Sequence, residues 1–334
     1  MTWHVVSVDA PPRTIGGVAA WSADAAAALA GAGQPVVLYG RRDGATSEWD
    51  AARPHPVVRM RGRSWLRRQA AWAALAVGPR LRRGDRLLCA TWTVATALQP
   101  VAHALGIPCL VGAHGSELTM LRSAPAPLRR MGPHVRWVPV SHFLAGELCR
   151  LGGSGWRRHV IPMPLELGPQ PSPGRREGLI CVARDTPLKG IDRAQHLARL
   201  LGEPLRLIGA SRPQDGADRE AGGLLRRDRA RAALGTARAA VLLPRTTVDG
   251  FGAEGLGLCL LEAAAAGTPT IGCRTGGVPE AIGPGMLLGD PDEPDAGAVR
   301  AWLATPGQGE RARAWVESHH GPAAFLATLA EAEA

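Results

Sequence analysis

The sequence predicts an α/β protein made of two doubly wound domains, each built on a parallel β-sheet. Short runs rich in Val, Leu and Ile alternate with segments of helical periodicity along most of the chain, which is typical of parallel sheets covered by helices. With 334 residues the chain is long enough for two domains of ordinary size. The stretch LGPQPSPGRREG at 167–178 interrupts the alternation, and its prolines and glycines favour an interdomain linker. We therefore expect domains at 1–168 and 169–309, with further helices at 310–334.

The first domain is expected to begin with a strand, a glycine turn and a helix. The apolar run at 5–8 predicts the strand, and the alanine-rich period at 18–32 predicts the helix. Gly16 and Gly17 stand between them, where glycine leaves backbone N–H groups uncovered at the positive end of a helix. This turn is therefore a candidate anion-binding loop. The remaining strands of this domain are predicted from apolar runs at 36–39, 57–60, 87–90, 108–112, 135–140 and 159–164.

His114 follows the predicted strand at 108–112, in the sequence AHGSEL. Open α/β sheets bind their ligands at the carboxyl ends of parallel strands, so His114 and Glu117 are candidates for a site there. Ser141 and His142 follow the next strand, but Ser141 has the place of a helix N-cap and no GxSxG motif surrounds it. We interpret this second pair as structural.

The second domain is predicted from strands at 179–183, 205–208, 240–243 and 286–288, with a helix at 295–304. Arg184 and Lys189 bracket the turn after its first strand. Lys189 is the single lysine of the chain, whereas arginine supplies every other basic side chain apart from histidine. A compact ammonium at such a turn favours a phosphate site. Asp290 and Asp292 form a DPD sequence, which we interpret as acids at a helix N-terminus rather than as metal ligands.

Composition and charge exclude several classes of protein. The six cysteines stand in apolar runs without a CxxC pair, which argues against a disulfide framework or a metal cluster and favours a cytoplasmic location. The N-terminus lacks the pattern of a signal peptide, and no segment has the length of a membrane span. Residues 1–170 hold 20 arginines against nine acidic residues, while residues 171–334 hold 19 Arg and Lys against 20 acidic residues. The first domain is therefore expected to meet any acidic partner, but no recognised module supports nucleic-acid binding.

The basic stretch at 59–86 has two interpretations. It sets Trp65, Leu66, Trp72 and Leu75 among many arginines, as in an amphipathic helix on an anionic membrane surface. An ordinary outer helix of the sheet, with Trp and Leu packed inward and Arg in water, explains the same pattern. We favour the ordinary helix.

The stretch DGFGAEGLGLCLLEAAAAGTPTIGCRTGGVPE at 249–280 carries the strongest functional signal. A helix that opens at Gly255 or Leu256 is apolar nearly all round, as in a helix buried against a sheet. Glu262 is the exception, because a buried carboxylate is costly unless a partner hydrogen-bonds it. On such a helix Glu254 would lie about 12 Å from Glu262, roughly the reach of a sugar, a diphosphate and a ribose.

This stretch resembles the donor-site signature of glycosyltransferase family 4, in the pattern FGxEGLGLxxLEA followed by AxGTPxIxxxxGGxPE. Members of that family are retaining enzymes with the GT-B fold, two Rossmann-like domains facing a central cleft. The resemblance implies a first domain that binds the acceptor and a second that binds a nucleotide-diphosphate sugar. It also implies that the last helices cross back onto the first domain, and that no metal or other cofactor is needed.

The family's functional residues are carried over onto the matching positions of this sequence. The resemblance implies catalytic roles for His114, Glu254, Arg184 and Lys189, with the imidazole near the transferred sugar. Glu254 would hold sugar hydroxyls and Glu262 the ribose, while Glu117 would face the acceptor. The implied donor-binding residues are Gly16, Gly17, Arg184, Lys189, Glu254, Gly255, Leu256, Gly257, Leu258 and Glu262.

Some alternatives remain open. Between the strands at 205–208 and 240–243 the family has a strand of the nucleotide-base region, and here that strand is missing or shortened. The identity of the nucleotide base is therefore the property that transfers least well from the family to this chain. A sugar-nucleotide epimerase or phosphorylase, a non-catalytic sugar-nucleotide binder, or a membrane-peripheral transferase acting on a lipid-linked acceptor would keep the fold. The simplest alternative is a buried helix on which Glu262 pairs with Arg245 or Arg274.

Overall fold

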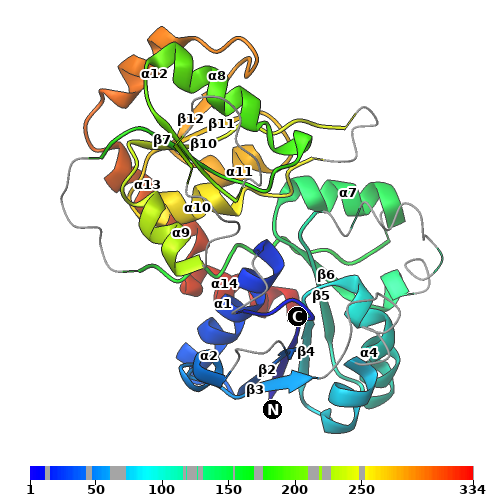
Figure 1. The fold of residues 1–334 in the computed structure, drawn as a ribbon. Helices are drawn as coiled ribbons and strands as arrows, with labels where there is room; N and C mark the ends of the chain where they lie inside the picture. The colour runs from blue at the N-terminus through cyan, green and yellow to red at the C-terminus, as the bar shows by residue number, and fades with distance from the viewer. Residues whose placement is uncertain are drawn as a thin grey trace. The chain divides into compact units, whose positions relative to one another are not determined.

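The computed structural model describes residues 1–11, 16–42, 47–60, 73–115, 118, 126, 131–152, 155–168, 176–209, 218–219, 227–247 and 253–333. The chain divides into two compact units (Figure 1). Unit 1 consists of Met1–Glu166 with Pro322–Ala334, and unit 2 of Leu167–Gly321. Each unit is built on its own six-stranded parallel sheet.

The sheet of unit 1 has the strand order β3-β2-β1-β4-β5-β6, with all neighbours parallel. Its strands are β1 (Trp3–Val6), β2 (Val36–Arg41), β3 (Val57–Met60), β4 (Arg86–Cys89), β5 (Cys109–Ala113) and β6 (Arg136–Pro139). The central strand β1 pairs Val5 with Leu38 on one side and with Leu88 on the other. All three side chains are fully buried, because a parallel sheet is covered on both faces.

Helices cover this sheet. They are α1 (Gly17–Gly31), α2 (Ser47–Ala51), α4 (Trp92–Leu105), α7 (His142–Gly152) and α14 (Pro322–Glu333), with the short 3-10 turns η1 (Gly78–Arg80) and η2 (Gly132–His134). Strand order reverses between β1 and β4, so the loops after these two strands diverge. The space between such loops is the usual ligand-binding position of an open α/β sheet.

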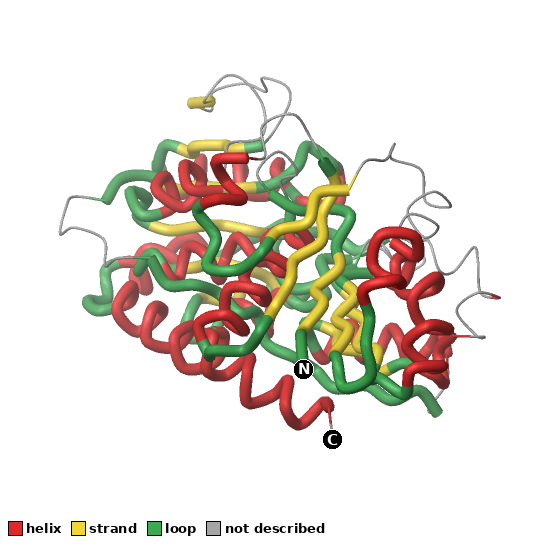
Figure 2. The backbone as a smooth tube through the Cα atoms, turned by 90° about the horizontal axis from the view of Figure 1, so that it is seen from below, coloured by secondary structure: helices red, strands yellow, loops and turns green. Residues whose placement is uncertain are grey.

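The sheet of unit 2 has the order β12-β11-β10-β7-β8-β9. Figure 2 colours the strands of the chain yellow and the helices red. The strands of this sheet are β7 (Leu179–Val182), β8 (Leu205–Ile208), β9 (Asp218–Arg219), β10 (Ala239–Leu242), β11 (Thr270–Cys273) and β12 (Met286–Leu288). The order reverses between β7 and β10. Among the described residues, β9 has two residues and lies in the segment where the sequence predicted a missing or shortened strand.

The helices of unit 2 form two layers. They are η3 (Pro187–Lys189), α8 (Ile191–Leu201), α9 (Arg227–Leu234), α10 (Leu258–Ala265), α11 (Val278–Ile282), α12 (Ala296–Leu303) and α13 (Gln308–His320). In Figure 1, α8 and α12 lie on one face of the sheet, and α9, α10, α11 and α13 on the other. Leu197, Val241, Ile271 and Val299 are at the centre of the core that α8 and α12 form with the sheet.

Two predicted elements differ from the structure. The first strand runs from Trp3 to Val6 rather than over 5–8, because Ser7 and Val8 already belong to the loop that follows. The predicted strand at 159–164 is an extended segment that accompanies β6 without forming a named strand. His159 N donates to Trp137 O over 2.9 Å, and Ile161 N donates to Pro139 O over 3.0 Å.

The predicted helical segment at 310–334 is divided between the units. Helix α13 belongs to unit 2, where Trp315 covers Gly283 so closely that a Cβ there would lie 2.3 Å from the indole. Helix α14 belongs to unit 1, where Arg136 Nη1 donates to Ala332 O over 2.9 Å and Arg86 forms an ion pair with Glu333.

Residues 61–72 of the basic stretch lie outside the described residues, and with them Trp65, Leu66 and Trp72. In the helical residues 73–77, Ala73 and Val77 are buried while Leu75 is 78% exposed, so inward packing of Leu75 is wrong. The side chain of Arg59 is 7% exposed and forms an ion pair with Asp50. Within the described part of the chain, no helix is both long and apolar enough to cross a membrane.

Burial of His320 predicts that unit 2 loses stability in acid. The side chain lies at the end of α13, 7% exposed and 5.2 Å from the Trp315 ring, and burial lowers its pKa from 6.5 to about 4. A group whose pKa is lowered in the folded state stabilises that state above its unfolded pKa, and this contribution is lost as the pH falls through the folded pKa. We expect the free energy of unfolding to fall by about 2–3 kcal/mol between pH 7.5 and pH 4.5 from this group. Urea unfolding of His320→Gln should show a pH slope smaller by that amount, and an unchanged slope would contradict the assignment.

Candidate functional site

The candidate donor site lies in unit 2, where strand order reverses between β7 and β10. The loop after β7 carries Arg184 and Lys189 and ends at Gly190, whose φ of 60° is left-handed. A Cβ at Gly190 would lie 1.9 Å from Leu243 O, so glycine is required for this loop to approach the end of β10. Arg245 N also donates to Leu188 O over 2.8 Å. The two loops are therefore held together at the carboxyl edge of the sheet.

Lys189 and Glu254 form an ion pair at this edge. Their side chains are 24% and 14% exposed, so the pair is accessible but largely surrounded by protein. The backbone of Glu254 is fixed by Gly277 N, which donates to Glu254 O over 2.8 Å. Gly276 must also be glycine, since a Cβ there would lie 2.1 Å from Glu254 O. Gly276 and Gly277, in the second half of the signature, thus support the loop that carries Glu254 in the first half.

Helix α10 begins at Leu258, later than the predicted start at Gly255 or Leu256. Gly257 precedes it with φ 98° and ψ 50°, a left-handed conformation that favours glycine and cannot continue a right-handed helix. Glu254 therefore lies on the loop before the helix, so a spacing counted along a helix axis does not apply to it. The N-terminus of α10 still carries the positive end of the helix dipole.

Glu262 lies on α10 and is buried, with 7% exposure. Arg227, at the start of α9, donates from Nε to Glu262 Oε1 over 2.5 Å. The structural alternative named Arg245 or Arg274 as the partner of Glu262, and neither is the partner in the structure: Arg245 pairs with Asp192, and Arg274 is exposed. The sequence gives no periodic or motif signal for Arg227, because it follows the stretch that departs from the family pattern.

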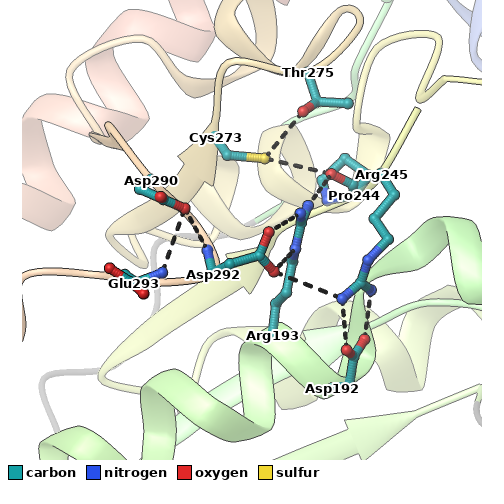
Figure 3. Close-up of polar contacts among 9 residues, drawn as sticks. All are labelled: Asp192, Arg193, Pro244, Arg245, Cys273, Thr275, Asp290, Asp292 and Glu293. Carbon is teal, nitrogen blue, oxygen red and sulfur yellow. Dashed lines mark hydrogen bonds and ion pairs between the residues drawn. The ribbon is translucent and has the colours of Figure 1, made fainter. Parts of the chain in front are cut away.

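A network of ion pairs lies beside the candidate donor site (Figure 3). Arg193 donates to both carboxylate oxygens of Asp292, over 2.7 and 2.5 Å, and Arg245 donates to both oxygens of Asp192, each over 2.6 Å. The hydrogen bonds from Arg245 hold the pKa of Asp192 below its ordinary value, and those from Arg193 do the same for Asp292. The network joins α8 to the ends of β10 and β12.

The DPD sequence has structural partners in this network. Asp290 Oδ1 accepts from the backbone N–H groups of Asp292 and Glu293, over 2.8 and 3.3 Å. Helix α12 is capped instead by Asp295, whose Oδ1 accepts from Ala298 N over 3.0 Å. The N-terminus of α12 is therefore capped by Asp295 and not by the predicted Asp290 and Asp292. Among the described residues, no group of three His, Cys, Asp or Glu is arranged to hold a metal ion.

The predicted site residues of unit 1 lie at the carboxyl edge of its sheet. His114 follows β5, and its Nε2 lies 3.1 Å from Ala90 O, just beyond β4. Its ring meets the Trp21 ring of α1 edge-on, with centroids 4.8 Å apart at 70°. Gly16 and Gly17 begin α1, and a Cβ at Gly16 would meet nothing within 4 Å. Glu117 lies outside the described residues.

Comparison with solved structures shows the fold. HepE of Anabaena, solved with UDP and glucose, gives a TM-score of 0.73 at 16% identity, with 99% of this chain and 98% of that chain covered. Sucrose-phosphate synthase of Thermosynechococcus elongatus gives 0.73 at 17% identity, covering 99% and 97%. AviGT4, a glycosyltransferase involved in avilamycin A biosynthesis, gives 0.70 at 18% identity, covering 99% and 96%. No curated protein sequence matches the chain significantly.

Residues 223–318 match the family model described as glycosyl transferases group 1. The chain is a glycosyltransferase with the GT-B fold. The matched segment contains α9 and α10, and with them Arg227, Glu254 and Glu262. The family model therefore covers the part of the candidate donor site that holds Glu254 and Glu262, whereas Arg184 and Lys189 precede the matched segment.

A hollow in the glycosyltransferase lies away from this site. It has a volume of about 240 Å³ and is lined by residues that include Glu177, Arg206 and Thr236. Glu177 precedes β7 and Thr236 precedes β10, so the hollow opens at the amino edge of the sheet. Parallel α/β sheets bind ligands at the opposite edge, and we assign the hollow no part in the reaction.

Two residues around His114 were missed in the sequence. A Cβ at Gly112 would lie 2.8 Å from both Ala90 O and His114 Nε2, and Trp21 is fully buried against the imidazole. A glycine inside a strand often marks the close approach of another group, so Gly112 carried a readable signal. The alanine-rich helix around Trp21 gave no comparable signal, because a buried tryptophan is ordinary core.

Proposed function

We propose that this glycosyltransferase is a retaining, metal-independent enzyme of glycosyltransferase family 4. It would move a sugar from a nucleotide-diphosphate sugar to a hydroxyl of a small-molecule, saccharide or lipid-linked acceptor. The observation that most directly supports the proposal is the Lys189–Glu254 pair at the β7–β10 switch point, beside the N-terminus of α10. A cation, a carboxylate and a helix N-terminus at one sheet edge match the phosphate and hydroxyl groups of such a donor.

The donor-binding roles follow from the chemistry of each group. Lys189 and the exposed Arg184 would bind the diphosphate, and the backbone of 255–258 would face the phosphates and the hexose. Glu254 would accept hydrogen bonds from sugar hydroxyls, and Glu262 from the ribose. Gly16 and Gly17, at the start of α1, would allow the donor or acceptor to approach the backbone. UDP-sugars are the first donors to test, because HepE was solved with UDP-glucose.

The proposed transfer breaks the bond between the anomeric carbon and the diphosphate oxygen and forms a bond from the acceptor oxygen on the same face. The nucleoside diphosphate departs with the electron pair, and the hydroxyl proton leaves with it. Negative charge grows on the diphosphate in the transition state, so preorganised positive groups lower the barrier. Lys189, Arg184 and the N-terminus of α10 can supply that charge, which supports a reaction without a metal ion.

A cytoplasmic location is also proposed. All six cysteines are free thiols, which fits a reducing compartment. We propose that any anionic membrane contact involves the basic stretch 59–86 and serves only to reach a lipid-linked acceptor.

Thermal shift with a panel of nucleotide sugars tests the donor class. A ligand at about 100 times its Kd stabilises the folded protein by about 2.7 kcal/mol, and for a unit of this size we expect the Tm to rise by about 5–10 °C. Transfer should continue in excess EDTA, and NMR of the product should show the anomeric configuration of the donor. A panel in which no nucleotide sugar raises the Tm would refute the proposal. Conversion of the donor in the absence of any acceptor, beyond slow hydrolysis, would favour an epimerase.

His114→Ala is expected to lower kcat by about 100-fold while the Kd of the donor changes less than about threefold. The reason is that the proposed role of His114 is to steady the sugar near the anomeric carbon, where orientation acts on the transition state. The measurements are hydrolysis of the nucleotide sugar selected by thermal shift, with water as acceptor, and calorimetric titration of that donor. An unchanged kcat would remove His114 from the mechanism.

A further inference from the structure

We propose that Gly112 is a positioning residue for sugar transfer, because it leaves the space in which the imidazole of His114 is held. Trp21, on helix α1, contacts the same ring from the helical layer, and we call the space between Gly112 and Trp21 the seat of the imidazole. The inference rests on the proposed role of His114 in transfer and goes further by naming what fixes the orientation of its ring. Gly112 and Trp21 act through His114 and have no proposed contact with substrate.

The ring of His114 is turned back toward the sheet. Its Nε2 lies 3.1 Å from Ala90 O, and a carbonyl oxygen can only accept, so Nε2 carries a proton and donates it. Ala90 is itself fixed, because its N–H donates to Val6 O over 2.9 Å. The imidazole is therefore tied to the ends of β4 and β1, at the switch point of unit 1. This hydrogen bond selects both the tautomer and the rotation of the ring.

Gly112 makes that hydrogen bond possible. Side chains two residues apart on a strand point to the same face, so a side chain at 112 would stand beside the one at 114. A Cβ added to Gly112 would lie 2.8 Å from Ala90 O and 2.8 Å from His114 Nε2. Both atoms of the hydrogen bond would then be closer than Cβ contacts allow. Because Gly112 and its neighbours are held in register with β4 and β6, the mobile partner is the imidazole, which must rotate away.

Trp21 holds the ring from the helical layer. Its side chain is fully buried on α1 and meets the His114 ring edge-on at 4.8 Å. Within the described residues its indole N–H has no hydrogen-bond partner, so its contribution to the seat is shape and an aromatic contact. Helix α1 starts at the Gly16–Gly17 turn, one turn before Trp21. The seat therefore connects His114 to the helix that carries the predicted glycine loop.

The test is a double-mutant cycle measured by hydrolysis of the nucleotide sugar selected by thermal shift, with water as acceptor. We expect Gly112→Ala to lower kcat by about 10- to 100-fold, since a displacement of about 1 Å can have that effect, with less than twofold change in donor KM. In the His114→Ala background the same substitution should change kcat by less than twofold, because the group it displaces is gone. A loss that multiplies with that of His114→Ala would overturn the proposal, as would a Gly112→Ala enzyme with wild-type kcat.

Gly146→Ala is the matched control. Gly146 lies on α7 of the same unit, and a Cβ there would meet nothing within 4 Å, so kcat should stay within twofold of the wild type. The cycle also separates the two levels of inference. If His114→Ala itself leaves kcat unchanged, the proposed catalytic role of His114 fails. If His114→Ala is slow and Gly112→Ala is not, the role of His114 stands and the seat fails.

A second measurement needs no variant at Gly112. NMR of 15N-histidine in the wild-type enzyme should show the Nε2-protonated tautomer of His114, identified by the signals lost in His114→Ala. Trp21→Phe, which keeps the core apolar but shortens the ring, should broaden or shift these signals and lower kcat several-fold. A proton on Nδ1 alone in the wild type, or unchanged signals and kcat in Trp21→Phe, would overturn the proposed seat even if Gly112→Ala does not fold.

Discussion

Lys189→Ala is expected to weaken binding of the nucleotide-sugar donor by about 10- to 100-fold, because a hydrogen bond to a charged group contributes about 1.5–3 kcal/mol. The loss should lie toward the upper end. Lys189 forms an ion pair with Glu254, and its removal leaves that carboxylate to repel the incoming diphosphate. The kcat should fall as well, since the charge that Lys189 would neutralise grows in the transition state. Calorimetric titration gives the Kd, and hydrolysis of the same donor gives kcat.

The same ion pair predicts the opposite effect on diphosphate affinity when Glu254 is changed instead of Lys189. Glu254→Gln keeps the shape of the side chain but releases Lys189 from its internal partner. The Kd of a free nucleoside diphosphate should then equal that of the wild type or be several-fold lower. The Kd of the complete nucleotide sugar should rise relative to the Kd of the free nucleoside diphosphate. Arg199→Ala is a suitable control, because it removes one exposed positive charge from α8 of the same unit. Equal donor affinity in Lys189→Ala and Arg199→Ala would refute the assignment of Lys189 to the diphosphate.

The sequence was sufficient for the architecture because periodicity reports burial directly. Runs of apolar residues gave most of the strands to within one or two positions, and among the described residues the two-residue strand β9 lies in the segment between 208 and 240 where a missing or shortened strand was predicted. The ends of elements were less predictable, because they depend on backbone geometry rather than on composition. The start of α10 is an example. Nothing in the apolar stretch indicates that Gly257 has a left-handed backbone conformation, which makes the helix begin at Leu258.

The chemical groups of the candidate site could be listed from the sequence, but their pairing could not. Lys189 and Glu254 are 65 positions apart and meet only because β7 and β10 are neighbours in the sheet. The structural alternative missed the arginine beside Glu262 for the same reason, since Arg227 reaches it from α9, a helix whose placement no local pattern fixes. Likewise, Gly112 is a single small residue in a strand until the fold brings Ala90 and His114 against it.

Glu262→Gln is the second variant for which we expect a large change in donor affinity. The result distinguishes two explanations of why the Glu262 carboxylate is buried. In the first, Glu262 accepts the ribose hydroxyls of the donor, and losing a charged acceptor should raise the donor Kd by about 10-fold or more. In the second, Glu262 only neutralises Arg227, whose Nε lies 2.5 Å from its Oε1. Removing one partner of a buried pair then destabilises the fold by leaving the other without its counter-charge.

Arg227→Gln is the matched variant, because it breaks the same ion pair from the other side while leaving the carboxylate in place. Arg227 is 26% exposed at its side chain and Glu262 only 9%, so the arginine can be hydrated more easily than the glutamate. We expect Arg227→Gln to lower the Tm slightly and to change the donor Kd less than threefold, whereas Glu262→Gln raises the Kd by 10-fold or more. If the two variants lower the Tm equally and neither changes the Kd, the carboxylate is structural and the ribose binds elsewhere. The comparison is decisive because both variants lose the same contact, and only one loses the group that a nucleotide would use.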